Sequence, residues 1–546
     1  MKRSSRATFF SVALSTVLAL QPIALNAQTS ETATPIQHVV VIFGENISFD
    51  HYFGTYPKAL NPPGQPAFHA LPHTPVVNGL TNALLTRNPN LNPANGTGAA
   101  NPFRLDRTQA QTADQNHDYG PEQASFDGGK MDLFPISTGT PGAPPAYYPK
   151  VVFTTGLVMG YYDGNTVTGL WNYAQHYAMN DNSYNSQFGP STPGAIDLIS
   201  GQTNGIVATL NGPSGDAVSD GQGGSTLVGD GDPIGDVCSS STRFQATLGG
   251  QNIGDLLNAE GITWGWFQGG FDLTKRNPNG TTGCKRSTVS PITGLAEGDY
   301  VPHHQPFQYY TSTANPKHTR PTNLASIGFP GDAANHQYDI HDWFDALKFG
   351  NLPAVSFLKA ASYQDGHPGN SNPLDEQAFV VRVVNALQAT SKWSSTAVIL
   401  AYDDSDGWYD HQMSPTVNAS FSEQDALNGK NTCGVKGKTP QLGGVFTNNP
   451  VDGRCGYGVR TPLLLISPWA KHNYVDHTLT DQTSVLRFIE DNWLGGTLKS
   501  GKLAGGKRIG QGSYDVRAGS LDRMFDFTQK ISAAPYLLNE VSGQPQ

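Results

Sequence analysis

Short runs of apolar residues recur along the chain and predict the strands of a buried sheet. The clearest runs lie at residues 37–43, 262–266, 354–358, 396–401 and 461–468. The run at 396–401, for example, is apolar at nearly every position, which is typical of a strand covered on both faces in a parallel sheet.

Segments with helical patterning separate these runs. We expect helices at residues 168–180, 195–200, 253–260, 375–388 and 480–493, and a short helix that Ser48 caps at its N-terminus. Gly201 and Gly261 follow two of these helices, as C-terminal glycines often do, and Thr480 or Asp481 would cap the last. Strands that alternate with helices predict an α/β fold with a central, mostly parallel sheet sandwiched by helices.

Four long segments rich in glycine, proline and polar residues interrupt this alternation, near 57–160, 204–250, 271–335 and 411–455. Loops of such length are usually functional, disordered, or insertions with small elements of their own. We therefore expect residues 28–546 to form a single domain with long loop insertions.

The first 27 residues have the pattern of a secretory signal peptide. Three basic residues precede a largely apolar stretch at 7–23, and small residues up to Ala27 offer a cleavage site. A membrane anchor is the alternative, but the stretch is short and contains Ser11, Ser15 and Gln21. No later stretch approaches the roughly 20 apolar residues that a membrane span needs. We expect an exported protein, secreted or periplasmic, without a transmembrane segment.

Composition narrows the possible partners and the compartment. The formal net charge of −10 becomes −13 without the signal peptide, which carries three positive charges and no negative one. This balance argues against a general nucleic-acid-binding protein, and an anionic substrate would need a local positive centre. The four cysteines suit an oxidising compartment, and local pairing of Cys238 with Cys284 and of Cys433 with Cys455 is the simplest of three connectivities.

Adjacent carboxylates follow the strand predicted at 396–401. Asp403 and Asp404 would repel each other, and burying both without a partner is costly. The usual partner at the carboxyl end of a buried strand in an α/β sheet is a metal ion or a cationic ligand. A solvated acidic loop is the alternative.

Glu45 and Asn46 follow the strand predicted at 37–43, so a parallel sheet would bring them to the edge where Asp403 and Asp404 lie. Taken alone, they could be a helix-capping and turn pair. Together the four side chains supply only oxygen ligands, which favours a hard divalent metal ion such as Ca, Mg, Mn or Fe.

Ser191 stands between Pro190 and Thr192, at the start of a predicted helix that we expect to begin at Pro193. Ser191 or Thr192 would then be an N-cap residue, which is the structural interpretation. The same geometry suits a nucleophile, because helix amides and the helix dipole hold an anionic phosphate. A coordinated metal ion would lower the pKa of the serine hydroxyl further.

Four histidines lie in loops rich in glycine, proline and aspartate: His117, His303, His304 and His367. Any one of them could be an ordinary surface residue. Beside a metal-anchored sheet edge, they could instead contact phosphate oxygens and protonate a leaving group.

Several motifs resemble those of one bacterial family. Residues 45–54 read ENISFDHYFG, close to the ENRSFDHYFG signature of the phosphoesterase family that contains phospholipases C and secreted acid phosphatases, within the alkaline-phosphatase-like superfamily. The other matching motifs follow in the family's order: FDGGKMD at 126–132, STPG at 191–194, PHHQPF at 302–307, DGHPG at 365–369 and YDDSDGWYDH at 402–411. The resemblance covers most of the chain beyond the signal peptide.

The resemblance implies a core like that of alkaline phosphatase and a role for each site residue. Ser191 would be the nucleophile, and the metal ligands would be Glu45, Asn46, Ser191, Asp403 and Asp404. His117, His304 and His367 would contact phosphate or act as acids, with His367 or His304 protonating the leaving group, and His303 could replace His304. Two departures are Ile47, where the signature has Arg, and Gly194, where phospholipase members typically carry Asn followed by Arg.

The resemblance also implies a metal-dependent phosphoric ester hydrolase, most simply an acid phosphatase that cleaves small phosphomonoesters through a phosphoserine. A phospholipase C acting on phospholipid diesters is the alternative, and a non-catalytic secreted metal- or glycan-binding protein is a remote one. The phosphatase is favoured by the Pro-Gly turn and by the Asp-Asp-Ser-Asp-Gly loop. It is also favoured because the chain ends about fifty residues after the last predicted helix, which leaves no room for the C-terminal β-domains that phospholipase members often carry. Several histidines suit an acidic pH optimum.

Overall fold

The computed structural model describes residues 1, 31–141, 153–212, 215–531 and 534–546. Residues 32–546 form one compact unit. The predicted signal peptide, apart from Met1, lies outside the described residues. Within the described ranges, no helix combines the length and the apolar character needed to cross a membrane.

An eight-stranded sheet forms the centre of the molecule, and seven of its strands run in the same direction. In spatial order the strands are β14 (Gln337–Asp339), β11 (Trp264–Gln268), β15 (Val355–Lys359), β1 (His38–Gly44), β16 (Thr396–Tyr402), β17 (Leu463–Ile466), β4 (Ala178–Asn180) and β18 (Tyr474–Asp476). Only β17 is antiparallel to its neighbours. The predicted α/β fold with a mostly parallel sheet is therefore confirmed.

The three central strands explain the apolar runs of the sequence. Every residue of β1, β15 and β16 is buried. Val41 of β1 lies opposite Phe357 on one side and Ile399 on the other, so the strands are in register. Covered on both faces, such strands have no solvent side on which polar residues could alternate.

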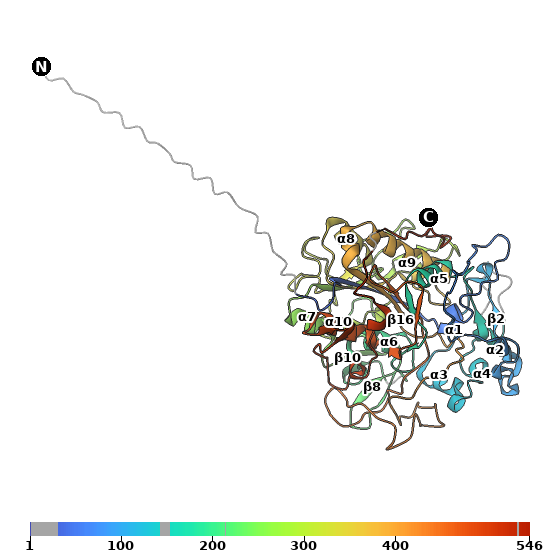
Figure 1. Cartoon of the computed structure of the whole chain (residues 1–546). Coiled ribbons are helices and arrows are strands. Elements are labelled where there is room, and N and C mark those ends of the chain that lie inside the picture. The colour runs from blue at the N-terminus through green and yellow to red at the C-terminus, as the bar shows by residue number, and fades with distance from the viewer. Residues whose placement is uncertain (2–30, 142–152, 213–214, 532–533) are drawn as a thin grey trace. The chain divides into compact units, whose positions relative to one another are not determined.

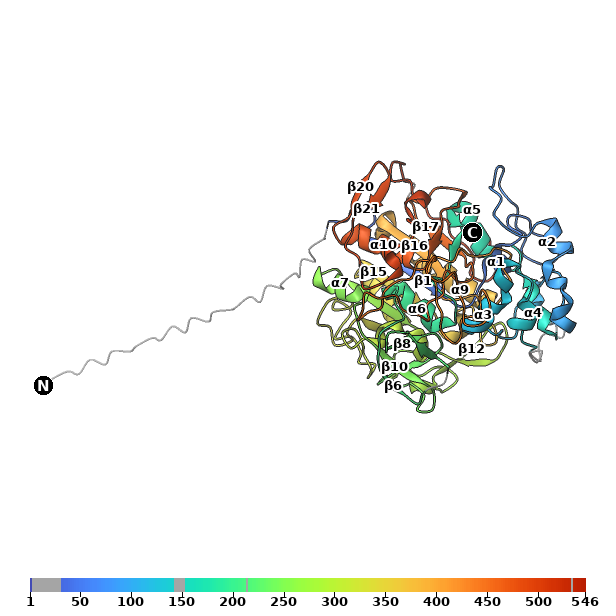
Figure 2. The same cartoon turned by 90° about the horizontal axis from the view of Figure 1, so that it is seen from below.

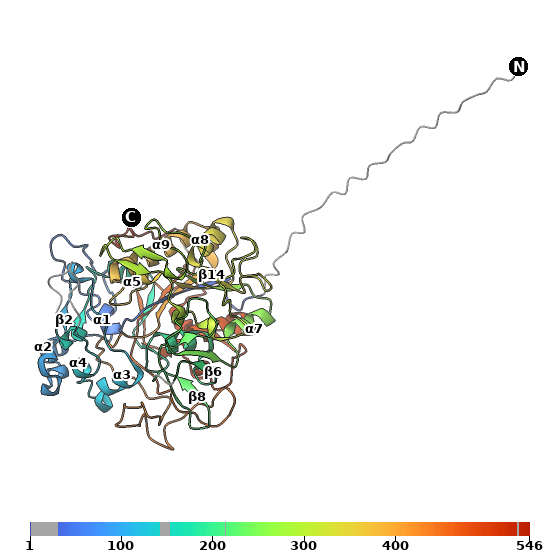
Figure 3. The same ribbon diagram turned by 180° about the vertical axis from the view of Figure 1, so that it is seen from behind.

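Helices cover the sheet in two layers (Figure 1). One layer holds α5 (Thr168–His176), α8 (Ile340–Phe349) and α9 (Pro373–Gln388), and the other holds α6 (Ser191–Ser200), α7 (Ile253–Ala259) and α10 (Thr483–Trp493). The view from behind shows the same division (Figure 3). The sandwich of helices predicted around the sheet is therefore present.

Three predicted helix boundaries are wrong, and tertiary pairing explains two of them. The helix predicted at 168–180 stops at His176, because residues 178–180 form β4 between β17 and β18. Thr480 and Asp481 form a short strand, β19, and α10 begins at Thr483, although Asp481 Oδ1 still accepts from the Thr483 backbone N–H at 2.7 Å, as a capping side chain does. The third, α6, begins at Ser191 instead of Pro193. The cap by Ser48 is confirmed, since its side chain accepts a hydrogen bond from the backbone N–H of His51.

The predicted insertions carry small elements of their own. The short helices α2 (Asn82–Thr86), α3 (Tyr119–Ser125) and α4 (Phe134–Ser137) gather beside α1 (Phe49–Phe53) at one side of the unit in all three views (Figures 1, 2 and 3). A small sheet of β6 (Ile206–Leu210), β10 (Gln245–Leu248) and β9 (Asp232–Pro233) forms the core of the second insertion.

Both predicted disulfides are present. Cys238 and Cys284 join the second insertion to the third, with 5.2 Å between their Cα atoms. Cys433 and Cys455 close the fourth insertion, with a Cα separation of 5.8 Å. The two disulfides therefore cross-link three of the four predicted insertions.

Candidate active site

The carboxyl ends of the three central strands bring charged side chains to one edge of the sheet. Glu45 follows β1, Asp403 follows β16, and Lys359 is the last residue of β15. Because Gly44 pairs with Tyr402 and Ile42 with Leu358, these ends lie level with one another. All three charged side chains are buried.

Ser191, the first residue of α6, faces three acceptor oxygens at this edge. Its Oγ lies 3.0 Å from Asp404 Oδ2, 3.3 Å from Glu45 Oε2 and 3.4 Å from Asn46 Oδ1. A serine hydroxyl donates one hydrogen, so at most one of the three oxygens can receive it. Such a convergence of oxygens around one point is the donor set that a hard divalent cation prefers.

The N-cap interpretation of Ser191 is wrong. Pro190 occupies the N-cap position of α6, so Ser191 does not cap the helix. The backbone N–H of Thr192 donates to Asp230 Oδ1 at 3.0 Å, so this helix amide is already occupied by a carboxylate. The side chain of Ser191 is therefore left for the acidic cluster.

Two residues of the site adopt left-handed backbone conformations, which residues other than glycine rarely take. Asn46 has φ of 60° and Asp406 has φ of 55°. The Asn46 backbone N–H donates to Asp403 Oδ1 at 3.1 Å, and its amide Nδ2 donates to Asp406 Oδ1 at 3.1 Å. These bonds hold the side-chain oxygen of Asn46 towards Ser191, and residues strained in this way gather at functional sites.

Lys359 is a member of the cluster that sequence analysis missed. Its Nζ lies 2.9 Å from Asp403 Oδ2, also contacts Glu45 Oε1, and stands 4.9 Å from the centre of the Phe43 ring. A signal existed, because Lys359 is a charged residue at the end of an apolar strand, just as Glu45 and Asp403 are. Burial lowers the pKa of Lys359, but the charges of Asp403 and Glu45 outweigh it and raise the pKa above its ordinary value.

Asp403 and Asp404 have different surroundings although they are adjacent. Asp403 Oδ2 faces Lys359, and its Oδ1 accepts from the backbone N–H groups of Asn46 at 3.1 Å and Asp404 at 2.8 Å. Burial and the neighbouring charge of Glu45 raise the pKa of Asp403 to about 7. Asp404, not Asp403, directs an oxygen to Ser191, so a ligand role for Asp403 stays a prediction.

The adjacent histidines point in different directions. His304 Nδ1 lies 2.9 Å from Glu45 Oε1, within the buried cluster. His303 instead faces Asp232, with 3.4 Å between Nδ1 and Oδ1. Burial, followed by the nearby cations His303 and Lys359, lowers the pKa of His304 well below its ordinary value.

His117 and His367 lie side by side, with their ring centres 5.9 Å apart. His117 Nδ1 is 2.8 Å from the carbonyl oxygen of Gln115, and His367 Nδ1 is 2.5 Å from that of Pro368. The Nδ1–H groups therefore donate to the backbone, which leaves Nε2 of His367 for a ligand, whereas Nε2 of His117 lies 3.4 Å from Asn46 Nδ2. Burial lowers the pKa of His117, but negative charges, first that of Asp404, raise it well above its ordinary value.

Two further groupings of side chains at this edge could hold a metal ion. One consists of Glu45, His304 and Asp365, and the other of Asp114, His117, His367 and Asp406. In each grouping the potential ligand atoms lie within 4.8 Å of one another. The structure thus brings together all the residues predicted for the site except His303, which lies at its margin.

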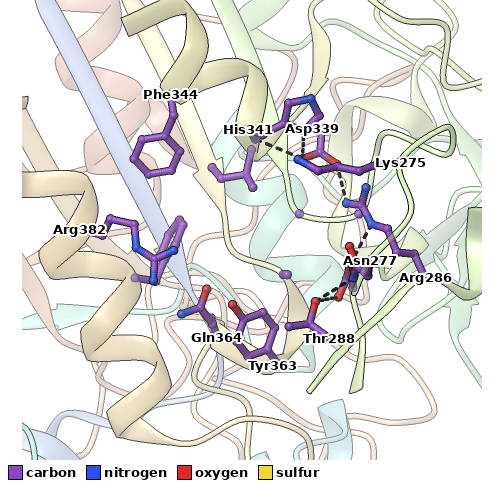
Figure 4. Close-up of a pocket in the computed structure, with 16 residues that line it drawn as sticks. Lys275, Asn277, Arg286, Thr288, Asp339, His341, Phe344, Tyr363, Gln364 and Arg382 are labelled. Atoms are coloured by element: carbon purple, nitrogen blue, oxygen red, sulfur yellow. Dashed lines mark hydrogen bonds and ion pairs between the residues drawn. The ribbon is translucent and has the colours of Figure 1, made fainter. Parts of the chain in front are cut away.

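A polar cavity of about 170 Å³ opens at the same sheet edge, on the side of α8 and α9 (Figure 4). Buried Arg286 forms its floor, with Nη2 at 2.7 Å from Asp339 Oδ2 and Nε at 2.9 Å from Asp299 Oδ2. Arg382 of α9 and Tyr363 also line the cavity. None of the residues predicted for the site lines it.

Comparisons with known proteins match most of the chain. The model of the phosphoesterase family matches residues 36–494. The non-hemolytic phospholipase C of Pseudomonas aeruginosa is 26% identical over 468 residues, which are 84% of this chain and 54% of that protein. Phospholipase C A of Mycobacterium tuberculosis is 25% identical over 468 residues, 84% of this chain and 72% of that protein. The chain thus spans about half the length of the Pseudomonas relative.

Likeness to solved structures is remote. Murine ectonucleotide pyrophosphatase/phosphodiesterase 5 aligns with a TM-score of 0.25 and 11% identity, over 59% of this chain and 88% of that one. A protein of the alkaline phosphatase superfamily from Vibrio parahaemolyticus aligns with a TM-score of 0.26 and 12% identity, over 70% of this chain and 67% of that one. At these scores the fold assignment rests on the sheet itself.

Proposed function

The chain belongs to the phosphoesterase family, and from this premise we propose that it is a metal-dependent phosphoric ester hydrolase with Ser191 as its nucleophile. One observation carries the proposal, namely the three acceptor oxygens that surround Ser191 Oγ within 3.4 Å. A structural serine would not require three buried acceptors around one hydroxyl group.

Glu45, Asn46, Asp404 and Ser191 would hold the divalent ion, with Asp403 behind them. Their oxygen atoms suit Ca, Mg, Mn or Fe. When bound, such an ion supplies positive charge that lowers the pKa of the serine hydroxyl and offsets the charge of the phosphoryl group.

The chain's own residues then account for the steps. Ser191 loses its hydroxyl proton to water, Oγ attacks phosphorus in line, and the ester bond breaks to give a phosphoserine. We assign protonation of the leaving oxygen to one of the histidines beside the acidic cluster, His117, His304 or His367. His304, with its lowered pKa, and His367 would contact phosphate. Water then cleaves the phosphoserine.

We propose small phosphomonoesters as the substrates, which makes the protein an acid phosphatase. Gly194 supports this choice, because a Cβ atom there would stand 2.0 Å from the carbonyl oxygen of Asp403. No side chain fits at a position where the family's phospholipases typically carry Asn, so the turn after the nucleophile is built differently here.

A specific observation favours the second candidate, a phospholipase C. Four aspartates lie close enough to interact through their charges, with Asp114, Asp216 and Asp230 acting on Asp118, which follows His117 in sequence. Their negative charge would suit the cationic head group of a phospholipid such as phosphatidylcholine. The curated relatives named above are also phospholipases C, although at about a quarter identity.

Export to the periplasm or the medium is part of the proposal. Both disulfides and the signal-peptide pattern support an oxidising compartment. The acidic net charge argues against a nucleic acid as the partner.

The decisive experiment compares substrates in one enzyme preparation across a pH series. Aryl phosphate, glycerol phosphate, glycerophosphocholine and phosphatidylcholine are assayed with and without added divalent ions. We expect a higher kcat/KM for the monoesters and an optimum below neutrality. Preferential release of diacylglycerol from phosphatidylcholine would assign the phospholipase activity instead, and no turnover of any ester by metal-loaded protein would refute the hydrolase.

A further inference from the structure

One lysine lies within the most acidic part of the molecule. Glu45, Asp365, Asp403 and Asp404 are each at most 2% exposed, and Lys359 Nζ contacts the first and third of them. The lysine side chain is itself 1% exposed. Water therefore does little to balance these charges, and the protein must do so.

The contacts of Lys359 divide the Glu45 carboxylate between two neighbours. Oε1 faces Lys359 and His304, whereas Oε2 faces Ser191. The ammonium also takes Asp403 Oδ2, while backbone N–H groups take Asp403 Oδ1. Lys359 thus pairs with the carboxylate oxygens that face away from Ser191. It does not contact the Glu45 oxygen that faces Ser191.

The side that Lys359 satisfies is itself a set of metal ligands. Glu45, His304 and Asp365 have potential ligand atoms within 4.8 Å of one another. Buried Asp365 Oδ2 has no hydrogen-bond partner among the described residues. Without the ammonium, the negative charges on these side chains and on Asp403 would have no cation beside them. Binding of a metal ion among their ligand atoms would then be strongly favoured.

We propose that Lys359 is a positioning residue that takes the place of a second divalent ion. Its ammonium balances Glu45 and Asp403, so that the cluster binds a single ion on the Ser191 side. The inference rests on the proposed function for that first ion. The alternative is an ordinary buried salt bridge with no effect on how many ions bind.

The test counts ions in the purified full-length protein. Each variant is stripped of metal, titrated calorimetrically with Mn²⁺, and checked by elemental analysis after removal of free ions. We expect one Mn²⁺ per chain in the wild type and two in Lys359→Met, which keeps the length of the side chain without its charge. Lys359→Arg keeps the charge and should bind one.

A double variant identifies where the additional ion binds. Lys359→Met combined with Asp403→Asn removes the lysine and one of its carboxylate partners, and should bind one ion again. If Lys359→Met alone does not fold, a double variant that folds and melts cooperatively supports the charge balance. A double variant no more stable than the single one overturns it.

Other outcomes separate this inference from the proposed function. Folded Lys359→Met that binds one Mn²⁺, or wild type that binds two, refutes the role of Lys359. Hydrolysis of aryl phosphate by the same wild-type preparation is measured in parallel. If the wild type binds Mn²⁺ and hydrolyses the ester while Lys359→Met gains no ion, only the inference about Lys359 fails.

Discussion

Two buried clusters of charge at the same sheet edge are satisfied in opposite ways. Arg286 donates to Asp299, Asp339 and the carbonyl oxygen of Asp272 at 2.7–2.9 Å, and Figure 4 shows its contact with Asp339. Around Ser191, by contrast, acceptor oxygens face one another with one hydroxyl hydrogen among them. A buried cluster in which every acceptor has a donor supports the fold, whereas one with surplus acceptors is prepared for a cation.

The largest expected effect lies at Ser191. Ser191→Ala should lower turnover by roughly 10³-fold or more, because it removes the hydroxyl that faces Glu45, Asn46 and Asp404 and would form the covalent intermediate. Stability should change little, since Ser191 does not cap α6. Turnover of an aryl phosphate and thermal melting measure the two effects, with exposed Ser394→Ala as the control. Retention of more than a few per cent of activity in the folded variant would contradict the assignment.

Adjacent carboxylates offer the next test of the comparison. Asp404→Asn should lower bound metal and rate more than Asp403→Asn, because Asp404 Oδ2 faces Ser191 and Asp403 Oδ2 faces Lys359. Elemental analysis and kcat are measured for both variants. Chelation should abolish wild-type activity and added divalent ion restore it. Equal losses in the two variants, or full activity in metal-free protein, would sink this division of roles.

A substitution in the Arg286 cluster should change the free energy of unfolding and not the binding of metal. Arg286→Met removes the buried guanidinium that pairs with Asp299 and Asp339 and should lower the free energy of unfolding by about 3–5 kcal/mol. Metal content of the folded fraction should be unchanged. Arg382→Met is the matched control, because Arg382 lines the same cavity but pairs with Glu540 at the exposed surface, where a pair contributes about 0–1 kcal/mol. Denaturation by urea distinguishes them, and a loss of bound metal in Arg286→Met would break the contrast.

The buried carboxyl group of Glu376 should make the free energy of unfolding depend on pH. Burial raises the pKa of Glu376 from 4.5 to about 7, and the hydroxyl groups of Tyr52 and Tyr402 donate to it. Because the pKa of Glu376 is higher in the folded state than in the unfolded state, protonation of this side chain stabilises the fold. The contribution is complete below pH 4.5 and is lost as pH rises through about 7. Glu376→Gln should remove this dependence, on the order of 3 kcal/mol for a shift of this size. Urea denaturation at pH 4.5, 6 and 7.5 tests it, and parallel curves for the two proteins would contradict it.

Sequence alone was sufficient where a local signal matches a local cause. The central strands were predicted because buried parallel strands are apolar on both faces. The residues at their carboxyl ends, Glu45, Asn46 and Asp404, were predicted because parallel strands end at one edge, and Ser191 because its motif is distinctive.

Only the tertiary structure decided which atoms meet. The strands β4, β14 and β18 have three residues each, too short for a periodic signal, and exist because neighbouring strands supply their hydrogen-bond partners. His303 and His304 are adjacent in sequence, yet only His304 reaches Glu45. Asp403 turns to Lys359, a residue without a motif, while Asp404 turns to Ser191. Residue spacing determines which side chains reach the edge, but strand register and side-chain rotamers determine which oxygen faces which cation, and those depend on packing from the whole chain.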